Sequence, residues 1–174
     1  MAARAPDPMR RALLRGKAQP STVIRPPWAL AEPEFLDACS RCNDCIDRCP
    51  EQVLAPGSGG YPVFDPLRGE CTFCGECASA CSTQALDRQA VRPPWHWIAD
   101  ISGDSCLAQR GVVCASCQDG CGERAIRFQP ALGAVPTPII DATRCTGCGA
   151  CVGLCPTQAI ALKNMPWKES SDAT

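Results

Sequence analysis

The cysteines are the residues of this chain that could carry out chemistry, because they are numerous and regularly spaced. All sixteen cysteines fall into four short runs. Three runs share the spacing C-x₂-C-x₂-C-x₃-C, and the third run along the chain stretches its first gap to seven residues. Thiolates at this spacing each bind one iron of a cubane, and the fourth cysteine of a run binds the neighbouring cluster. The spacing therefore predicts four [4Fe–4S] clusters.

The four runs are named in chain order. The first is Cys39, Cys42, Cys45 and Cys49; the second is Cys71, Cys74, Cys77 and Cys81; the third is Cys106, Cys114, Cys117 and Cys121; the fourth is Cys145, Cys148, Cys151 and Cys155. Disulfide scaffolds do not usually repeat one spacing, and zinc would take cysteines from two separated pairs, usually with histidine. Because His96 is the single histidine, both alternatives are disfavoured.

The rule that the fourth cysteine crosses over divides the cysteines into four ligand sets. Set 1 is Cys39, Cys42, Cys45 and Cys81; set 2 is Cys71, Cys74, Cys77 and Cys49; set 3 is Cys106, Cys114, Cys117 and Cys155; set 4 is Cys145, Cys148, Cys151 and Cys121. The gaps between runs are all 21–24 residues long, so a nested pairing of outer with outer and inner with inner runs stays open. The stretched run makes set 3 the one expected to be labile or incomplete.

Composition excludes several classes of function. Only 5% of the 174 residues are aromatic, so a large apolar core is not expected. Bound clusters would then stabilise the fold by linking its segments. With its clusters loaded, the net charge of −1 becomes about −9, which disfavours nucleic-acid binding.

No apolar run approaches the ~18–20 residues of a transmembrane segment. No nucleophile–base constellation or nucleotide loop is present, so we expect neither an enzyme nor a small-molecule substrate. Sixteen thiols kept for metal fit a reducing compartment.

A four-residue segment that precedes two of the cysteine runs, here called the lead, occurs twice and indicates how the chain is divided. Arg25-Pro26-Pro27-Trp28 recurs as Arg92-Pro93-Pro94-Trp95, and each tryptophan stands eleven residues before the first cysteine of a run. This predicts an α+β fold made by tandem duplication of a bacterial-type two-cluster ferredoxin unit, with a small core and many loops. The units would span residues 25–91 and 92–165. We expect both tryptophans to pack over a cluster or between the halves, and Trp97 and His96 to pack likewise.

A finer repeat follows the fourth cysteine of every run. Its copies are Glu51–Leu54, Thr83–Leu86, Glu123–Ile126 and Thr157–Ile160. Each predicts a helical turn that runs into a short strand, with residues 61–65 and 138–141 pairing back and Gly57–Gly60 as a turn. The result would be a βαββαβ-like unit, present twice. Three glycines are expected to let the backbone approach a cluster closely, namely Gly75, Gly147 and Gly149.

The two ends of the chain differ in charge from the middle. Residues 1–24 form a basic arm, with Arg4, Arg10, Arg11, Arg15 and Lys17 against Asp7. Arg10-Arg11 resembles a twin-arginine signal, but the polar segment 16–21 stands where an apolar region is required, so export is disfavoured. A short basic helix, a disordered arm or docking on an acidic partner remain as interpretations. Residues 166–174 are expected to form a flexible tail.

Taken together, these features resemble the NapF family, the ferredoxin-type proteins of periplasmic nitrate reductase systems. The resemblance rests on Arg10-Arg11, the Arg25–Trp28 lead, three regular runs and the stretched run that begins Cys106-Leu107-Ala108, and it spans about residues 10–162. It implies a cytoplasmic accessory protein that interacts with the catalytic subunit of periplasmic nitrate reductase and assists its maturation before export. The alternative is a simple electron-transfer polyferredoxin that relays single electrons. Only the sixteen cysteines are carried over from the family.

Overall fold

The structure, a computed structural model, describes residues 23–88 and 93–165. Residues 23–65 and 75–88 form one compact unit, and residues 66–74 and 93–165 form another. The predicted domain boundaries stay a prediction, but the segment 66–74 groups with the second unit. No helix within the described ranges is long and apolar enough to cross a membrane. The predictions for residues 1–22, for Arg92 and for the tail at 166–174 lie outside the described residues.

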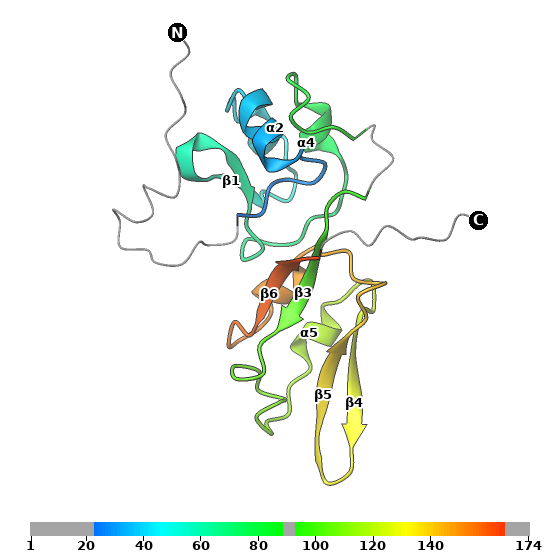
Figure 1. The fold of residues 1–174 in the computed structure, drawn as a ribbon. Helices are drawn as coiled ribbons and strands as arrows, with labels where there is room; N and C mark the ends of the chain where they lie inside the picture. The colour runs from blue at the N-terminus through cyan, green and yellow to red at the C-terminus, as the bar shows by residue number, and fades with distance from the viewer. Residues whose placement is uncertain (1–22, 89–92, 166–174) are drawn as a thin grey trace, which may run out of the picture. The chain divides into compact units, whose positions relative to one another are not determined.

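The elements are short, and both helices and strands are present (Figure 1). The first unit contains α2 (Glu32–Ala38), α3 (Asp44–Asp47), β1 (Leu54–Pro56), the 3₁₀ turn η1 (Ser58–Gly60), β2 (Pro62–Phe64) and α4 (Glu76–Ser79). The second unit contains β3 (Trp97–Ile101), α5 (Ser116–Asp119), β4 (Ile126–Ala131), β5 (Ala134–Ile140), α6 (Ala150–Gly153) and β6 (Ile160–Asn164).

The first unit is built on one hairpin and one bridge. Strands β1 and β2 pair antiparallel, with Leu54 opposite Phe64, and the turn at residues 57–60 joins them as predicted. In place of the strand predicted after Cys81, the first unit has a single antiparallel bridge between Ala29 and Leu86. Helix α3 packs against α4, and these two helices carry the third cysteines of the first two runs.

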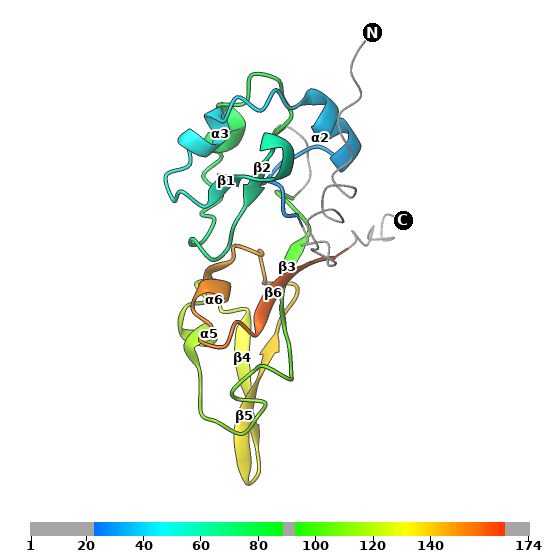
Figure 2. The ribbon, with the colours of Figure 1, turned by 90° about the vertical axis from the view of Figure 1, so that its left-hand side faces the viewer.

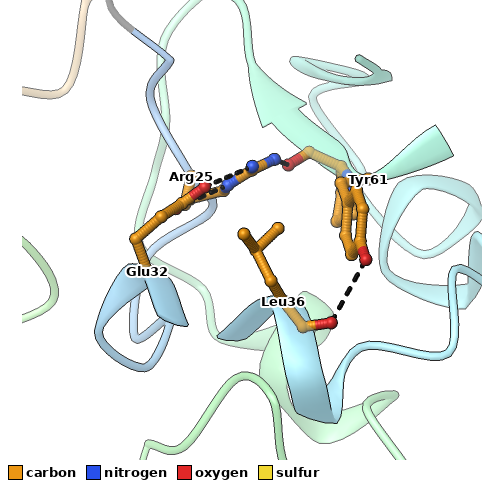
Figure 3. A network of polar contacts seen from close by, with 5 residues as sticks. Arg25, Glu32, Leu36 and Tyr61 are labelled. Carbon is orange, nitrogen blue, oxygen red and sulfur yellow. Dashed lines mark hydrogen bonds and ion pairs between the residues drawn. The ribbon is translucent and has the colours of Figure 1, made fainter. Parts of the chain in front are cut away.

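Helix α2 leads directly into the first run. Pro33 stands in its first turn together with Glu32 and Glu34, which suit the positive end of a helix. Arg25 lies between Glu32 of this helix and the β1–β2 hairpin, where Tyr61 donates a hydrogen bond to the carbonyl of Leu36 at 3.2 Å (Figure 3). These contacts fix α2, and with it the entry to Cys39, against the hairpin.

The second unit is built on two antiparallel pairs (Figure 2). Strand β3 pairs with β6, and Ile101 stands opposite Ile160. Strands β4 and β5 form a hairpin with a register shift between Gln129 and Ala131. Helix α5 packs against α6, so the two helices with the third cysteines of their runs again lie together.

The residues that follow each fourth cysteine belong to the core of both units. Their side chains are at most 4% exposed: Val53, Leu54, Ala85, Leu86, Ala125, Ile126, Ala159 and Ile160. Asp65 donates its N–H to the carbonyl of Val53 at 2.9 Å, and Asp141 does the same to Ala125 at 2.8 Å. The predicted step from turn to strand is confirmed after Cys49, Cys121 and Cys155, whereas after Cys81 only the bridge at Leu86 is present.

Candidate iron–sulfur centres

In the three regular runs the backbone turns sharply at the second cysteine. The residues on either side of that cysteine are left-handed, with φ between 53° and 89°: Arg41 and Asn43, Phe73 and Gly75, Gly147 and Gly149. The following residue begins the four-residue helix that carries the third cysteine. The three glycines expected to allow a close approach, Gly75, Gly147 and Gly149, all have positive φ. A β-carbon at Gly147 would also collide with the carbonyl oxygen of Trp97.

The stretched third run reaches its helix by another path. Ala115, which precedes α5, has a φ of −133° instead of a left-handed conformation. The seven-residue loop folds back on itself through N–H bonds from Arg110 to the carbonyl of Cys106 at 3.1 Å and from Val112 to that of Leu107 at 2.9 Å. This loop returns Cys106 to the same cavity as Cys114.

A tight turn follows each fourth cysteine. Its third residue is left-handed in all four copies, with φ from 52° to 56°: Gln52, Gln84, Arg124 and Gln158. In the second unit the turn directs the next N–H back to the cysteine sulfur, at 3.3 Å from Ala125 to Cys121 and at 3.2 Å from Ala159 to Cys155. Sequence reasoning missed these left-handed positions because none of them is glycine.

Two cavities in the second unit are each lined by one predicted ligand set. The first is lined by all of set 3, together with Ser116 and Thr157. The second is lined by all of set 4, together with Glu123. The structure thus places the four cysteines of each set around a common space.

In the first unit the members of set 1 come together around Cys45. Burial, and next the nearby thiols of Cys39, Cys81 and Cys42, raise the pKa of Cys45 to about 12. Of the predicted set 2, Cys49 and Cys77 lie in the first unit, whereas Cys71 and Cys74 lie in the second. The role of all sixteen cysteines as cluster ligands stays a prediction.

The buried third cysteines of the second unit have raised pKa values too. Burial raises the pKa of Cys117 to about 11, with a further rise from the thiols of Cys106, Cys114 and Cys155. Burial also raises the pKa of Cys151 to about 12, followed by the charges of Cys145, Cys148, Cys121 and Cys117. These neighbours are the ones that sequential pairing of runs predicts.

Cys155 is an exception among the thiols. Burial raises its pKa, but a hydrogen bond from the Thr157 hydroxyl and backbone N–H bonds from Ala159, Thr157 and Ile160 outweigh burial and lower it. The pKa of Cys148, in contrast, is raised by burial, although Ala150 and the Thr146 hydroxyl donate to its sulfur. Hydrogen bonds from N–H and O–H groups favour a thiolate because they stabilise its negative charge.

The segment 66–74 lies along the fourth run within the second unit. Cys71 donates its N–H to the carbonyl of Cys148 at 2.8 Å. The ring of Phe73 meets that of Trp95 edge-on, with centroids 5.3 Å apart, and the indole nitrogen of Trp95 donates to the carbonyl of Thr146 at 2.8 Å. The predicted packing role of this tryptophan takes the form of contacts with two C-x₂-C loops.

The donor sets fit a cubane. Thiolates surround each cavity, and N–H groups point at their sulfurs, which is the environment that iron–sulfur clusters require. Within residues 23–88 and 93–165, no three or more His, Cys, Asp or Glu side chains are arranged to hold one metal ion. A cubane needs a wider arrangement, because its four thiolates bind four different irons.

Comparison with protein families agrees with this chemistry. Residues 38–86 match a 4Fe-4S dicluster domain, and residues 138–161 match a 4Fe-4S binding domain. The first match covers the first and second runs, and the second covers the fourth run. The chain is therefore an iron–sulfur protein of the electron-transfer type, and [4Fe–4S] clusters are its cofactors.

Several characterised proteins are similar over most of the chain. The ferredoxin-type protein NapF of Escherichia coli (strain K12) is 41% identical over 155 residues, which cover 88% of this chain and 93% of that protein. The ferredoxin-type protein NapF of Haemophilus influenzae is 39% identical, with 92% and 96% covered. The methylamine utilization ferredoxin-type protein MauM of Methylobacillus flagellatus is 35% identical, with 89% and 74% covered.

Proposed function

The chain belongs to the NapF family of ferredoxin-type proteins, and we propose that it is a four-cluster accessory protein of periplasmic nitrate reductase. In this proposal it works in the cytoplasm, where it contacts the catalytic subunit and assists its maturation before export. The location and the partner follow from the family resemblance. The mode of action follows from the ligand sets.

The proposed mode of action rests on the number of cysteines that line each cavity. Each of the two cavities in the second unit is lined by four thiols. A cluster with a thiolate on every iron has no open coordination position for a substrate. Such a cluster exchanges electrons, so we assign the protein the delivery of single electrons to the immature subunit.

A second candidate is a simple electron relay that feeds a mature redox partner. The similarity to MauM favours it, because that ferredoxin-type protein is named for methylamine utilization. The two candidates differ in the state of the partner. An accessory protein for maturation binds the unexported form preferentially, whereas a relay binds the mature form at least as well.

One mixing experiment separates these roles. Protein reconstituted with ⁵⁷Fe and then reduced is mixed without oxygen with the catalytic subunit, in its cluster-free form and in its loaded, unexported form. We expect the loaded form to be reduced while Mössbauer spectroscopy finds the label still in the donor. If the label appears as a cubane in the cluster-free subunit, the protein donates clusters, and the proposal of electron delivery is wrong. Stronger binding of the mature, exported subunit would favour the relay.

We also propose that the two units arose by tandem duplication. A similar hydrogen bond occurs in both units, from Leu30 to the carbonyl of Ala85 at 3.1 Å and from Ser102 to that of Ala159 at 2.8 Å. The left-handed residue after each fourth cysteine supports the same origin.

A further inference from the structure

The two cavities of the second unit differ at one equivalent position. Thr157 stands two residues after the last cysteine of the fourth run, and Glu123 stands two residues after the last cysteine of the third. Because these cysteines cross over, Thr157 lines the cavity of set 3 and Glu123 lines that of set 4. The Thr157 hydroxyl lies 3.7 Å from the sulfur of Cys155. A carboxylate at Glu123 has no proton to donate to Cys121.

Other groups around set 3 add to this difference. The hydroxyl of Ser116 lies 3.9 Å from the sulfur of Cys114, so two hydroxyl groups reach the sulfurs of this set. An iron-bound thiolate accepts hydrogen bonds and has no proton to give, so both hydroxyls donate. Ala159 adds an N–H bond to Cys155 at 3.2 Å.

The sulfurs of set 4 receive donors of a different kind. Ala125 donates its N–H to Cys121 at 3.3 Å, Ala99 donates to Cys145 at 3.4 Å, and the Thr146 hydroxyl donates to Cys148. Backbone N–H groups therefore do not favour set 3. What separates the cavities is one additional hydroxyl at set 3 and two carboxylates at set 4: Glu123, which lines that cavity, and Glu70, whose negative charge acts on Cys148.

These differences bear on the order in which the clusters accept electrons. Hydrogen bonds to sulfur and the local net charge both set the potential of a cluster. A donor stabilises the negative charge that reduction adds, and a carboxylate opposes it. We propose that set 3 holds the higher-potential cluster of the second unit and set 4 the lower, with Thr157 and Glu123 tuning the two.

The redox step is a single-electron transfer. Each cluster takes one electron from a one-electron reductant, dithionite in the titration below, and its core charge falls by one. No bond forms or breaks and no proton is taken up. The inference rests on the proposed function only in that both require electron-carrying clusters, because the order of potentials is measured without any partner protein.

The first unit repeats the alternation of hydroxyl and carboxylate. Thr83 follows Cys81, and its hydroxyl lies 3.7 Å from that sulfur, whereas Glu51 follows Cys49 at the same spacing. Cys81 is the crossing ligand of set 1 and Cys49 that of set 2. The same argument predicts a higher potential for set 1 than for set 2.

The test is a redox titration of the loaded, full-length protein followed by electron paramagnetic resonance. The variants are Thr157→Val, Thr157→Ser and Glu123→Gln, with Thr137→Val in strand β5 as the matched control. We expect Thr157→Val to shift one of the early-reducing clusters to lower potential, and Thr157→Ser to restore it because serine keeps the hydroxyl. Glu123→Gln should shift a late-reducing cluster to higher potential, and the control should change neither.

Cys106→Ser assigns the signals, because removal of a set 3 ligand should delete an early-reducing cluster. The proposal is overturned if that variant deletes a late-reducing cluster. It is also overturned if Thr157→Val titrates like the unaltered protein while Cys155 still holds its cluster. Should Thr157→Val fail to load, Glu123→Gln decides by itself, since an unchanged late-reducing cluster in that variant contradicts the assignment.

Discussion

The indole N–H of Trp95 donates to the carbonyl oxygen of Thr146 at 2.8 Å. Thr146 lies between the first two cysteines of the fourth run, and Phe73, which packs edge-on against the same indole ring, lies between the first two of the second run. One side chain from the repeated lead therefore holds the backbone of a ligand loop. Its function is to position cysteines of set 4.

Trp95→Phe should make the cluster of set 4 more labile. The substitution keeps a ring against Phe73 but leaves the Thr146 carbonyl without its indole donor, a loss of about 1 kcal/mol. We expect faster bleaching of one cluster's visible absorbance under a chelator. Trp97→Phe in β3 is the control. Equal bleaching rates for the two variants would show that the Trp95 hydrogen bond does not hold the loop.

Gly147→Ala should prevent the fourth run from loading. Gly147 has a φ of 73°, and a β-carbon there collides with the Trp97 carbonyl. Gly133, at the tip of the β4–β5 hairpin, has a φ of 71° and open space around it. Gly133→Ala therefore carries the same conformational cost of about 1–2 kcal/mol without the collision. Iron analysis should show one cluster lost in Gly147→Ala and none in Gly133→Ala, and full loading of both would contradict the close approach.

Arg25→Ala should destabilise the first unit. The guanidinium forms two hydrogen bonds to Glu32, at 2.6 and 3.0 Å (Figure 3). It also donates to the carbonyl of Pro62 at 3.1 Å and lies 4.9 Å from the Phe35 ring centroid. We expect the free energy of unfolding to fall by about 2 kcal/mol. The exposed pair of Lys163 and Asp100 provides the control.

Lys163→Ala should cost at most about 0.5 kcal/mol, as exposed ion pairs do. Denaturant titration of the loaded variants measures both effects. If Arg25→Ala cost no more than Lys163→Ala, the Arg25 contacts would not be what fixes α2 to the hairpin.

The repeat in the sequence predicted the parts of the fold that depend on a local pattern. Buried pairs such as Val53 and Leu54 follow each fourth cysteine, so the turn, the strand and the core position could be foreseen. The left-handed residues could not, because Gln52 and Arg124 carry no sign of positive φ. Their conformation follows from the turn that brings the next N–H back toward the cysteine.

Equal spacing did not mean equal structure in the two leads. Both tryptophans stand eleven residues before a run, yet α2 follows Trp28 and strand β3 follows Trp95. Pro33 with its flanking glutamates favours a helix start, whereas the aromatic and β-branched residues Trp97, Ile98 and Ile101 favour a strand. The assignment of cysteines to cavities also needed the structure, because gap lengths left two pairings open.

The rate of cluster loading should keep increasing with pH above the pKa of an ordinary thiol. The pKa is about 12 for Cys45 and Cys151 and about 11 for Cys117. A thiol binds iron only after it loses its proton, and a raised pKa keeps that proton bound as pH increases. The initial rate of loading of the apo-protein should therefore continue to rise above about pH 8.5, the ordinary pKa of a free cysteine. A rate that levels off below this pH would contradict the raised values.

The crossing of the fourth cysteines is tested most directly by iron content in a pair of substitutions. Full loading corresponds to about 16 iron atoms per chain, and Cys106→Ser or Cys155→Ser alone should leave about 12. If both cysteines hold set 3, the double variant also retains about 12, whereas Cys106→Ser with Cys148→Ser falls to about 8. A Cys106 and Cys155 double variant that falls to about 8 would mean that the two cysteines serve different clusters, and would contradict the sets assigned here.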